Sequence, residues 1–147
     1  MGSGKSFIGK KLSEYWNCDF YDLDVLIEKN EGLTIVEIFE KYGQSYFREK
    51  ETEMLKSNFL QKYCIVSTGG GTPCFNNNQE YMNQNGFTIY LETDIKLLVE
   101  RLWKQKEQRP LLKNIESKIE LENFTQGLLD QRKIYYLRSM LILKVTK

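Results

Sequence analysis

The 147-residue sequence contains no histidine, only two prolines and three cysteines. The absence of histidine excludes the usual general base, the most common metal ligand and every scheme that pairs a serine or cysteine with an imidazole. Proton transfer must therefore fall to aspartate, glutamate, lysine or arginine. The cysteines Cys18, Cys64 and Cys74 are odd in number and lack paired spacing, which argues against a disulfide framework or a zinc knuckle. We therefore expect a reducing, cytoplasmic compartment.

Long apolar runs and a strong net charge are also absent. The most apolar stretch, residues 140–145, is far too short to span a membrane, and lysines interrupt the N-terminal residues where a signal peptide would be apolar. The formal net charge is +1, so no general basic field draws the chain to nucleic acid or anionic lipid. We expect a monomer without nucleic-acid or membrane partners, in which any bound anion is held by a local site.

The order of segments is typical of an α/β protein with a parallel sheet, because short apolar runs alternate with longer segments of near-helical periodicity. The length fits one domain with a single core. Thr34, with Glu37 three residues later, and Thr93 are candidate helix N-caps. The expected strands are 19–22, 64–67, 87–91 and 140–145, and the expected helices are 4–16, 24–30, 34–42, 45–61, 94–104 and 116–137.

The chain opens with Gly2-Ser3-Gly4-Lys5-Ser6 and leads directly into an amphipathic helix. This is the second half of the phosphate-loop pattern G-x-x-x-x-G-K-[ST]. Gly2 and Gly4 allow backbone angles that turn successive N–H groups toward phosphate oxygens, and the helix N-terminus adds a partial positive charge. Lys5 supplies a full charge for the β- and γ-phosphates, and the Ser6 hydroxyl can ligate Mg²⁺. We therefore expect nucleotide binding rather than a merely flexible start.

The first half of that pattern would require another glycine two positions before Met1, at the end of a central strand. We therefore expect that the first strand is missing from this sequence and that the natural protein begins roughly ten residues earlier.

Two pairs of charged side chains are candidates for the acceptor site. Asp22 and Asp24 follow a strand, at the edge of a parallel sheet where ligands collect. One carboxylate can serve a metal and the other an acceptor hydroxyl; alternatively, both cap the next helix. Arg48 and Arg132 are candidates for a bidentate carboxylate clamp, although each residue taken alone fits a surface ion pair better.

Two segments that are expected to be loops also carry candidate site residues. Gly69-Gly70-Gly71 follows a strand directly, as in a tight turn or where backbone N–H groups closely approach a ligand. Residues 105–114 are polar and contain Pro110, as in a plain surface connection or a mobile lid. An Arg109 in a lid could stabilise charge on a transferring phosphoryl group. Taken alone, these residues indicate an ATP-dependent kinase of a small anion.

In order and spacing, these motifs together resemble the shikimate kinase family over residues 1–136. The resemblance implies a three-layer α/β/α P-loop kinase fold with a parallel sheet in the order 2-3-1-4-5. It implies one domain over 1–147, with acceptor-binding helices at 24–61 and a lid at 105–114. The implied reaction moves the γ-phosphoryl group of ATP to the 3-hydroxyl of shikimate. The motifs that carry the resemblance are Gly2-Ser3-Gly4-Lys5-Ser6, Asp22-Leu23-Asp24 followed by Ile27-Glu28, Tyr46-Phe47-Arg48-Glu49-Lys50-Glu51, Ser67-Thr68-Gly69-Gly70-Gly71, Arg109-Pro110-Leu111-Leu112, and Arg132 with Tyr136.

The resemblance also implies a role for each site residue. Lys5, Asp24 and Arg109 are the expected catalytic residues, and Ser6 and Asp22 the expected ligands of Mg²⁺. The expected ATP-binding residues are Gly2, Ser3, Gly4, Lys5, Ser6, Phe7 and Arg109. The expected shikimate-binding residues are Asp24, Arg48, Gly70 and Arg132. The alternatives are another small P-loop kinase, for gluconate or a nucleoside monophosphate, and a truncated, non-catalytic ATP-binding remnant.

Overall fold

The computed structural model describes residues 2–57, 63–104, 112 and 114–146. The chain forms two compact units. One unit comprises Gly4–Asn78, and the other comprises Met1–Ser3 together with Gln79–Lys147. The predicted lid at 105–114 falls almost entirely outside the described residues, and so do residues 58–61. The predicted helix at 45–61 ends earlier than expected, at Leu55, with Lys56 as its C-cap.

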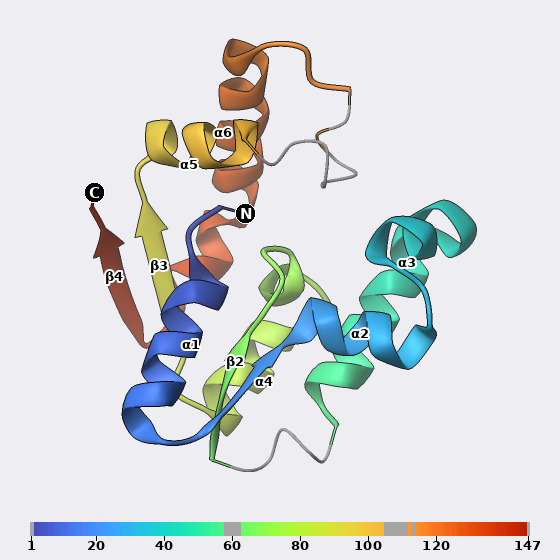
Figure 1. Ribbon diagram of the computed structural model, residues 1–147, viewed down its shortest axis with the longest axis vertical. Helices are drawn as coiled ribbons and strands as arrows, with labels where there is room; N and C mark the ends of the chain where they lie inside the picture. Colours follow the sequence, from blue (N-terminus) through green and yellow to red (C-terminus); the bar gives the residue numbers. More distant parts are fainter. Residues whose placement is uncertain (1, 58–62, 105–111, 113, 147) are drawn as a thin grey trace. The chain divides into compact units, whose positions relative to one another are not determined.

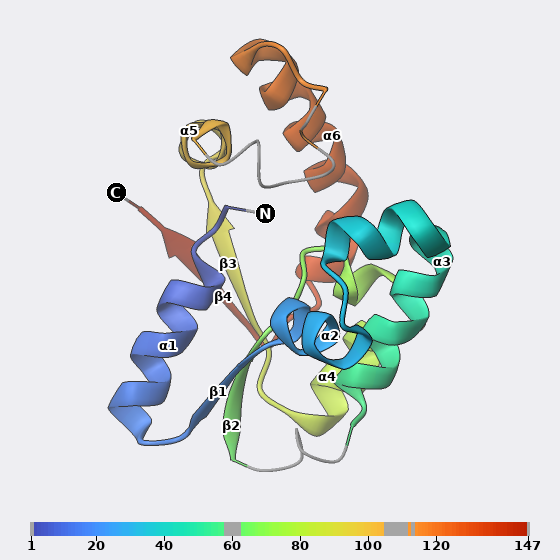
Figure 2. The same ribbon diagram turned by 45° about the vertical axis from the view of Figure 1, so that its right-hand side comes forward.

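The unit Gly4–Asn78 is built on two parallel strands, β1 (Asp19–Asp22) and β2 (Cys64–Ser67). Helix α1 (Lys5–Trp16) lies alongside the pair, and α2 (Leu23–Glu31) continues directly from the end of β1 (Figures 1 and 2). Both strands have the predicted bounds. A parallel pair places the carboxyl ends of its strands at the same edge, so the residues that follow β1 and β2 are brought together.

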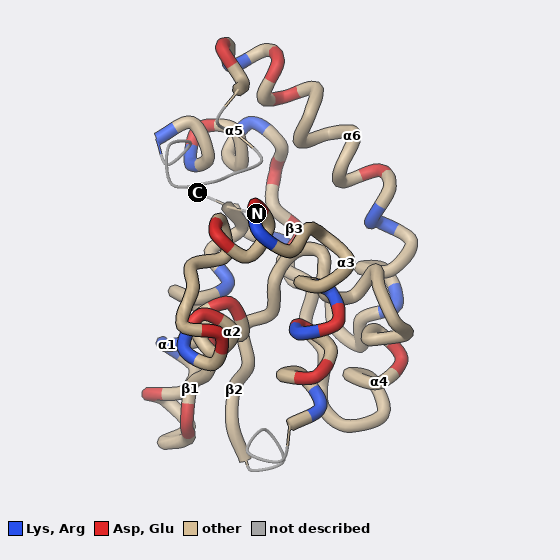
Figure 3. The backbone as a smooth tube through the Cα atoms, turned by 90° about the vertical axis from the view of Figure 1, so that its right-hand side faces the viewer, with Lys and Arg blue, Asp and Glu red and all other residues tan. Residues whose placement is uncertain are grey.

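Helix α3 (Ile35–Leu55) is interrupted at Gly43, whose backbone has φ 81° and ψ 179°. A positive φ of this kind favours glycine. The interruption agrees with the two separate helices that the sequence predicts, 34–42 and 45–61. The predicted N-cap is confirmed: the Glu37 N–H donates to Thr34 Oγ1 at 3.3 Å, and Glu37 Oε2 accepts from the Thr34 N–H at 2.7 Å. Charges of both signs are interspersed along α3 (Figure 3).

The apolar interior of this unit lies where α2 and α3 meet. It is formed by fully or nearly fully buried side chains of the two helices: Leu23, Ile27, Ile38, Phe47 and Leu55. Burial of each such side chain contributes roughly 1.5–3 kcal/mol.

The second unit contains another parallel pair, β3 (Ile89–Thr93) and β4 (Leu141–Val145). Three helices accompany it: α4 (Asn78–Asn85), α5 (Ile95–Trp103) and α6 (Lys118–Tyr136). Five buried apolar residues form its core cluster: Val99, Leu102, Leu112, Ile115 and Leu121. Ile95, Trp103 and Phe124 pack against that cluster.

The strand neighbours and most elements agree with the prediction, although several bounds differ by one or two residues. The pairs β1–β2 and β3–β4 are the neighbours 2-3 and 4-5 of the predicted order. Strand β3 begins at Ile89 rather than at residue 87, and Asp94, not Thr93, caps α5 by accepting from the Lys96 N–H at 2.9 Å. Helix α4 was not among the predicted helices, because its eight mostly polar residues show almost no apolar periodicity.

Among the helices that the structure describes, none has the length and apolar character needed to cross a membrane.

Candidate active site

The start of α1 meets the ends of both strands of the first unit. The Ser6 hydroxyl donates a hydrogen bond to Asp22 Oδ2 at 2.6 Å, and it lies 3.4 Å from the hydroxyl of Ser67. Asp22 and Ser67 are paired at the ends of β1 and β2. The two residues predicted to hold Mg²⁺ are therefore in direct contact, at the edge of the sheet where the sequence places them.

The backbone of the phosphate loop has the geometry expected of a phosphate cradle. Gly2 and Gly4 both adopt positive φ, 73° and 86°, which L side chains rarely adopt. Gly4 is the N-cap of α1, and no side chain caps the first turn. The N–H groups at the start of this helix, which Lys5 begins, point toward the side from which a phosphate would approach.

The residues of this loop and of the first helical turn differ in their surroundings. Gly2 lies close to α5, where a Cβ at position 2 would come within 3.1 Å of Leu102, and its carbonyl accepts from Arg101 Nη1 at 3.3 Å. Ser3 is half-buried, whereas the ring of Phe7 is 68% exposed on α1.

Asp22 caps α2 as well as contacting Ser6. Its Oδ1 accepts from the Asp24 N–H at 3.2 Å while its Oδ2 accepts from Ser6. The simple alternative of helix capping is thus correct for Asp22, but the same carboxylate also reaches the phosphate loop. Asp24 takes no part in the capping through its side chain, which leaves that carboxyl available for other chemistry.

The pKa of Asp24 is raised to about 6. Burial is the largest cause, followed by the negative charges of Asp22 and Glu51, and the ammonium of Lys5 opposes them. A carboxylate with this pKa is still ionised at neutral pH and accepts a proton more readily than an ordinary aspartate. A raised pKa at a strand end beside a phosphate loop is typical of a catalytic group.

Arg48 is held by a buried acid rather than by the solvent-exposed ion pair considered from the sequence. Its Nη1 donates to Glu51 Oε2 at 2.7 Å, and the side chains of Arg48 and Glu51 are 12% and 0% exposed. Glu51 Oε1 accepts from the Thr72 hydroxyl at 2.5 Å. The Nε of Arg48 is buried without a hydrogen-bond partner in the described part of the chain, so the guanidinium keeps donor capacity that the protein does not use.

The glycine turn at 69–71 is needed for space rather than for unusual backbone angles, because none of its glycines has positive φ. A Cβ on Gly71 would lie 2.5 Å from Arg48 Nη2. A Cβ on Gly69 would lie 2.8 Å from Glu51 Oε1 and 3.3 Å from Asp24 Oδ1. The turn therefore lies against both the candidate base and the candidate clamp, with Gly70 half-buried between the other two glycines.

The sequence predicts no site role for Glu51, Thr72 or Phe75, whose ring centroid lies 4.5 Å from Arg48 Cζ. A signal for Glu51 existed in the i, i+3 spacing from Arg48 on a predicted helix, but that spacing is also common on exposed helix faces. Thr72 and Phe75 carried no signal, since only the folded chain brings the segment after β2 against α3.

Two predicted arginines, Arg132 and Arg109, are not part of this cluster in the described residues. Arg132 lies half-buried on α6, in the second unit. Arg109 lies outside the described residues.

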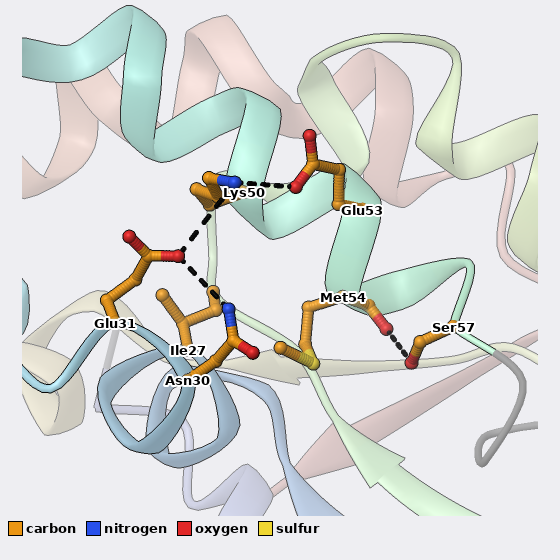
Figure 4. Close-up of a pocket in the computed structure, with 7 residues that line it drawn as sticks. All are labelled: Ile27, Asn30, Glu31, Lys50, Glu53, Met54 and Ser57. Carbon is orange, nitrogen blue, oxygen red and sulfur yellow. Dashed lines mark hydrogen bonds and ion pairs between the residues drawn. The ribbon is translucent and has the colours of Figure 1, made fainter.

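Two surface pockets lined by described residues contain none of the predicted site residues. A pocket of about 230 Å³ between α2 and α3 contains Lys50, which is ion-paired with Glu53 at 2.9 Å and Glu31 at 4.0 Å (Figure 4). A pocket of about 390 Å³ lies in the second unit, where Lys133 and Lys144 share the lining with acidic side chains. Mixed charges of this kind do not provide a dedicated anion site.

Comparison with known proteins identifies the family. The family model for shikimate kinase matches residues 1–145. The chain belongs to the shikimate kinase family. The shikimate kinase of Flavobacterium psychrophilum is 43% identical over 138 residues, which cover 92% of this chain and 80% of that protein. With this family membership, the protein is an ATP-dependent kinase.

Solved shikimate kinases show the same fold. The crystal structure of shikimate kinase from Bacteroides thetaiotaomicron has a TM-score of 0.89 at 37% identity, covering 98% of this chain and 81% of that one. Shikimate kinase from Acinetobacter baumannii, solved in complex with shikimate, has a TM-score of 0.86 at 33% identity, covering 100% and 80%. These matches confirm the α/β fold of the P-loop kinases that the sequence predicts.

Proposed function

We propose that this member of the shikimate kinase family transfers the γ-phosphoryl group of ATP to the 3-hydroxyl of shikimate, giving ADP and 3-phosphoshikimate. The observation that carries the proposal is the glycine turn, which lies against Asp24 on one side and Arg48 on the other. A small hydroxy acid bound at this turn can place a hydroxyl at the carboxyl group of Asp24 and its carboxylate at a guanidinium.

The phosphates of ATP are assigned to the loop at the start of α1. Gly2, Ser3 and Gly4 offer backbone N–H groups, and Lys5 supplies a full positive charge for the β- and γ-phosphates. Ser6 and Phe7 complete the segment that contacts ATP. Phosphoryl transfer needs mainly placement and charge neutralisation, which a preorganised loop of this kind supplies.

A magnesium ion fits the contact between Ser6 and Asp22. One hydroxyl and one carboxylate oxygen are ligands that Mg²⁺ accepts, the remaining positions being filled by water and substrate phosphates. Within the part of the chain that the structure describes, no group of three or more acidic or cysteine side chains could hold a metal alone, and a shared protein–phosphate site does not require one. The bound ion would neutralise phosphate charge, with Asp22 acting directly or through water.

Asp24 is assigned the proton of the acceptor hydroxyl. In the transfer, a bond forms between the 3-oxygen of shikimate and the γ-phosphorus, and the bond from that phosphorus to the bridging oxygen of ADP breaks. The hydroxyl proton passes to the Asp24 carboxylate. With a pKa of about 6, this group is mostly ionised at pH 7, and its pKa is close enough to the working pH for it to act as a base.

Arg48, Gly70 and Arg132 are assigned to the rest of shikimate. The Nε of Arg48, which has no hydrogen-bond partner among the described residues, supports a role of Arg48 in binding the carboxylate, and Arg132 is proposed as the second arginine of the clamp. Arg109 is proposed to reach the transferring phosphates from a lid at 105–114. We further propose a single domain over 1–147 with acceptor helices at 24–61, a monomeric state, and a cytoplasmic location, where ATP is supplied and the three free cysteines stay reduced.

A substrate panel tests the proposal. ADP formation is followed in a coupled assay with shikimate, gluconate or a nucleoside monophosphate as acceptor, and ATP binding is measured on the same preparation. We expect turnover with shikimate alone. Turnover with gluconate but not shikimate would assign the protein to another kinase activity, and ATP binding without any turnover would identify a non-catalytic ATP-binding protein.

A further inference from the structure

The guanidinium of Arg48 lies against two aromatic rings. Its Cζ is 4.5 Å from the ring centroid of Phe75 and 5.0 Å from that of Phe47. Both distances fall within the range of a cation–π attraction, which strengthens as the cation loses contact with water. Because the Arg48 side chain is only 12% exposed, the interaction is at the stronger end of that range.

The two rings have different structural roles. Phe47 is 4% exposed and packs against Phe39 at 4.8 Å between ring centroids, so it belongs to the core between helices. Phe75 is half-buried and follows the short 3₁₀ helix Thr72–Cys74 with an extended backbone, φ −124° and ψ 153°. Its nearer contact with the guanidinium of Arg48 is therefore not explained by core packing.

The segment that bears Phe75 is fastened to the same turn of α3 that bears Arg48. Asn76 Nδ2 donates to the Arg48 carbonyl oxygen at 3.2 Å and to Thr52 Oγ1 at 2.9 Å. The fully buried Asn78 donates from Nδ2 to the same Thr52 hydroxyl at 3.1 Å. The backbone of Arg48 and the ring beneath its side chain are thus fixed by one set of hydrogen bonds.

Glu51 and Gly71 also lie beside the guanidinium of Arg48. Glu51 takes one N–H of Nη1, and the backbone at Gly71 leaves no room for a Cβ beside Nη2. A ring against one face of a guanidinium leaves its edge, where the N–H groups point, available for a carboxylate in the same plane. The ring of Phe75 therefore limits the orientations in which Arg48 can form a bidentate pair.

We propose that Phe75 is a positioning residue of the acceptor site, which orients the Arg48 guanidinium for the carboxylate of the substrate. The proposal rests on the assignment of Arg48 to that carboxylate under the proposed function. Phe75 acts through Arg48 and has no role toward ATP, so its removal changes the affinity for an acceptor carboxylate selectively.

The test compares Phe75→Leu, which keeps apolar volume but removes the π-face, with Phe75→Tyr, which restores it. We expect Phe75→Leu to raise the KM for shikimate roughly five- to thirtyfold, with the KM for ATP and kcat within twofold of wild type. Phe75→Tyr should return the KM for shikimate to within threefold of the wild-type value. Phe87→Leu, at an aromatic residue that is 68% exposed in the other unit, is the matched control and should change neither KM.

A neutral acceptor isolates the carboxylate from general packing. With the methyl ester of shikimate, whose acid group is uncharged, Phe75→Leu should cost less than threefold in kcat/KM. Equal losses for acid and ester, or equal rises in both KM values, would overturn the positioning role. Thermal unfolding verifies that each variant is folded, and Phe75→Met replaces Phe75→Leu if the latter does not fold. Absence of shikimate turnover in the wild type would refute the proposed function itself, whatever the Phe75 variants do.

Discussion

The two units of this protein differ in what they bury. In Gly4–Asn78, polar side chains that include Glu51, Thr72 and Asn78 are fully buried and linked by hydrogen bonds around the glycine turn. In the unit of β3, β4, α5 and α6, the core is a cluster of aliphatic residues, and the buried polar side chains among its described residues, Gln79, Thr93 and Thr125, are uncharged. Burying an acid is costly unless it is well paired, whereas an aliphatic cluster stabilises the fold directly.

This difference indicates where each unit carries its function. Around the glycine turn, the first unit keeps groups that are costly to bury: a fully buried glutamate and an arginine on α3, and an aspartate with a raised pKa just beyond the end of β1. Such groups persist where they serve binding or catalysis. Substitutions of these polar groups should therefore change turnover more than stability, and substitutions in the aliphatic cluster of the second unit should do the reverse.

The largest effect is expected from Asp24→Asn, which removes the base without changing the size of the side chain. The kcat should fall about 10²- to 10⁴-fold, the usual contribution of a positioned acid–base group, while ATP still binds. Steady-state kinetics and ATP titration measure the two effects. An unchanged kcat would remove Asp24 from the mechanism and weaken the contrast between the units.

Lys5→Ala should lower kcat about 10²- to 10³-fold, as expected for loss of a preorganised charge at the transferring phosphates. Lys10→Ala is the matched control, because Lys10 is exposed on the same helix, and it should remain within twofold of wild type. Turnover of Lys5→Ala within a factor of two of wild type would exclude the phosphate role.

Leu121→Ala tests the second unit. Leu121 is 1% exposed in the aliphatic cluster, so its truncation should lower the free energy of unfolding by about 2–5 kcal/mol. Ile119→Ala, at a side chain that is 74% exposed on the same helix, should stay within about 0.5 kcal/mol of wild type. Denaturant unfolding measures both variants. Near-normal KM values for the folded fraction of Leu121→Ala are expected, and a selective loss of shikimate affinity would contradict the division of roles.

Arg48→Lys should raise the KM for shikimate about 10- to 30-fold, because a lysine keeps the charge but loses the planar fork that binds a carboxylate at two points. The KM for ATP should change less than twofold. Lys50→Met, two residues away on the same helix, is the control and should alter neither KM. Equal rises for shikimate and ATP would contradict the clamp.

The smallest effect concerns stability and pH. The folded pKa of Asp24, about 6, lies above the unfolded value of about 3.9, so ionisation of this group opposes folding as the pH rises through that range. Three acids (Asp22, Glu51 and Glu28) raise the pKa beyond the effect of burial, and Lys5 opposes them.

Asp24→Asn should therefore increase the free energy of unfolding at pH 7.5 by about 1–3 kcal/mol, after discounting for partial exposure. The gain should shrink as the pH falls through 6 and vanish below about pH 3, where Asp24 is protonated in both states. Denaturant unfolding at several pH values measures it, with the exposed Asp130→Asn as the control. A gain that is independent of pH would show that the ionised carboxylate is not its source.

Much of the site could be predicted from the sequence because its motifs are local. Gly4, Lys5 and Ser6 are consecutive, so the phosphate loop needs only the following helix to acquire its function. Asp22 and Asp24 lie where the sequence predicts, at the last residue of β1 and just beyond it, because this strand has the bounds that the sequence predicts. In contrast, Phe75 and Thr72 acquire their roles through contacts with α3, more than 20 residues earlier in the chain, and no local pattern encodes such a contact.

The sequence alone determined the alternation of strands and helices, the phosphate loop and the carboxylates at the end of β1, since these follow from side-chain periodicity and short-range spacing. Only the tertiary structure decided that Glu51 is buried, that the glycines at 69 and 71 provide space rather than positive φ, and that an aromatic ring faces Arg48. The physical reason is that burial, pKa and stacking depend on neighbours that are distant in sequence, and those neighbours exist only once the chain has folded.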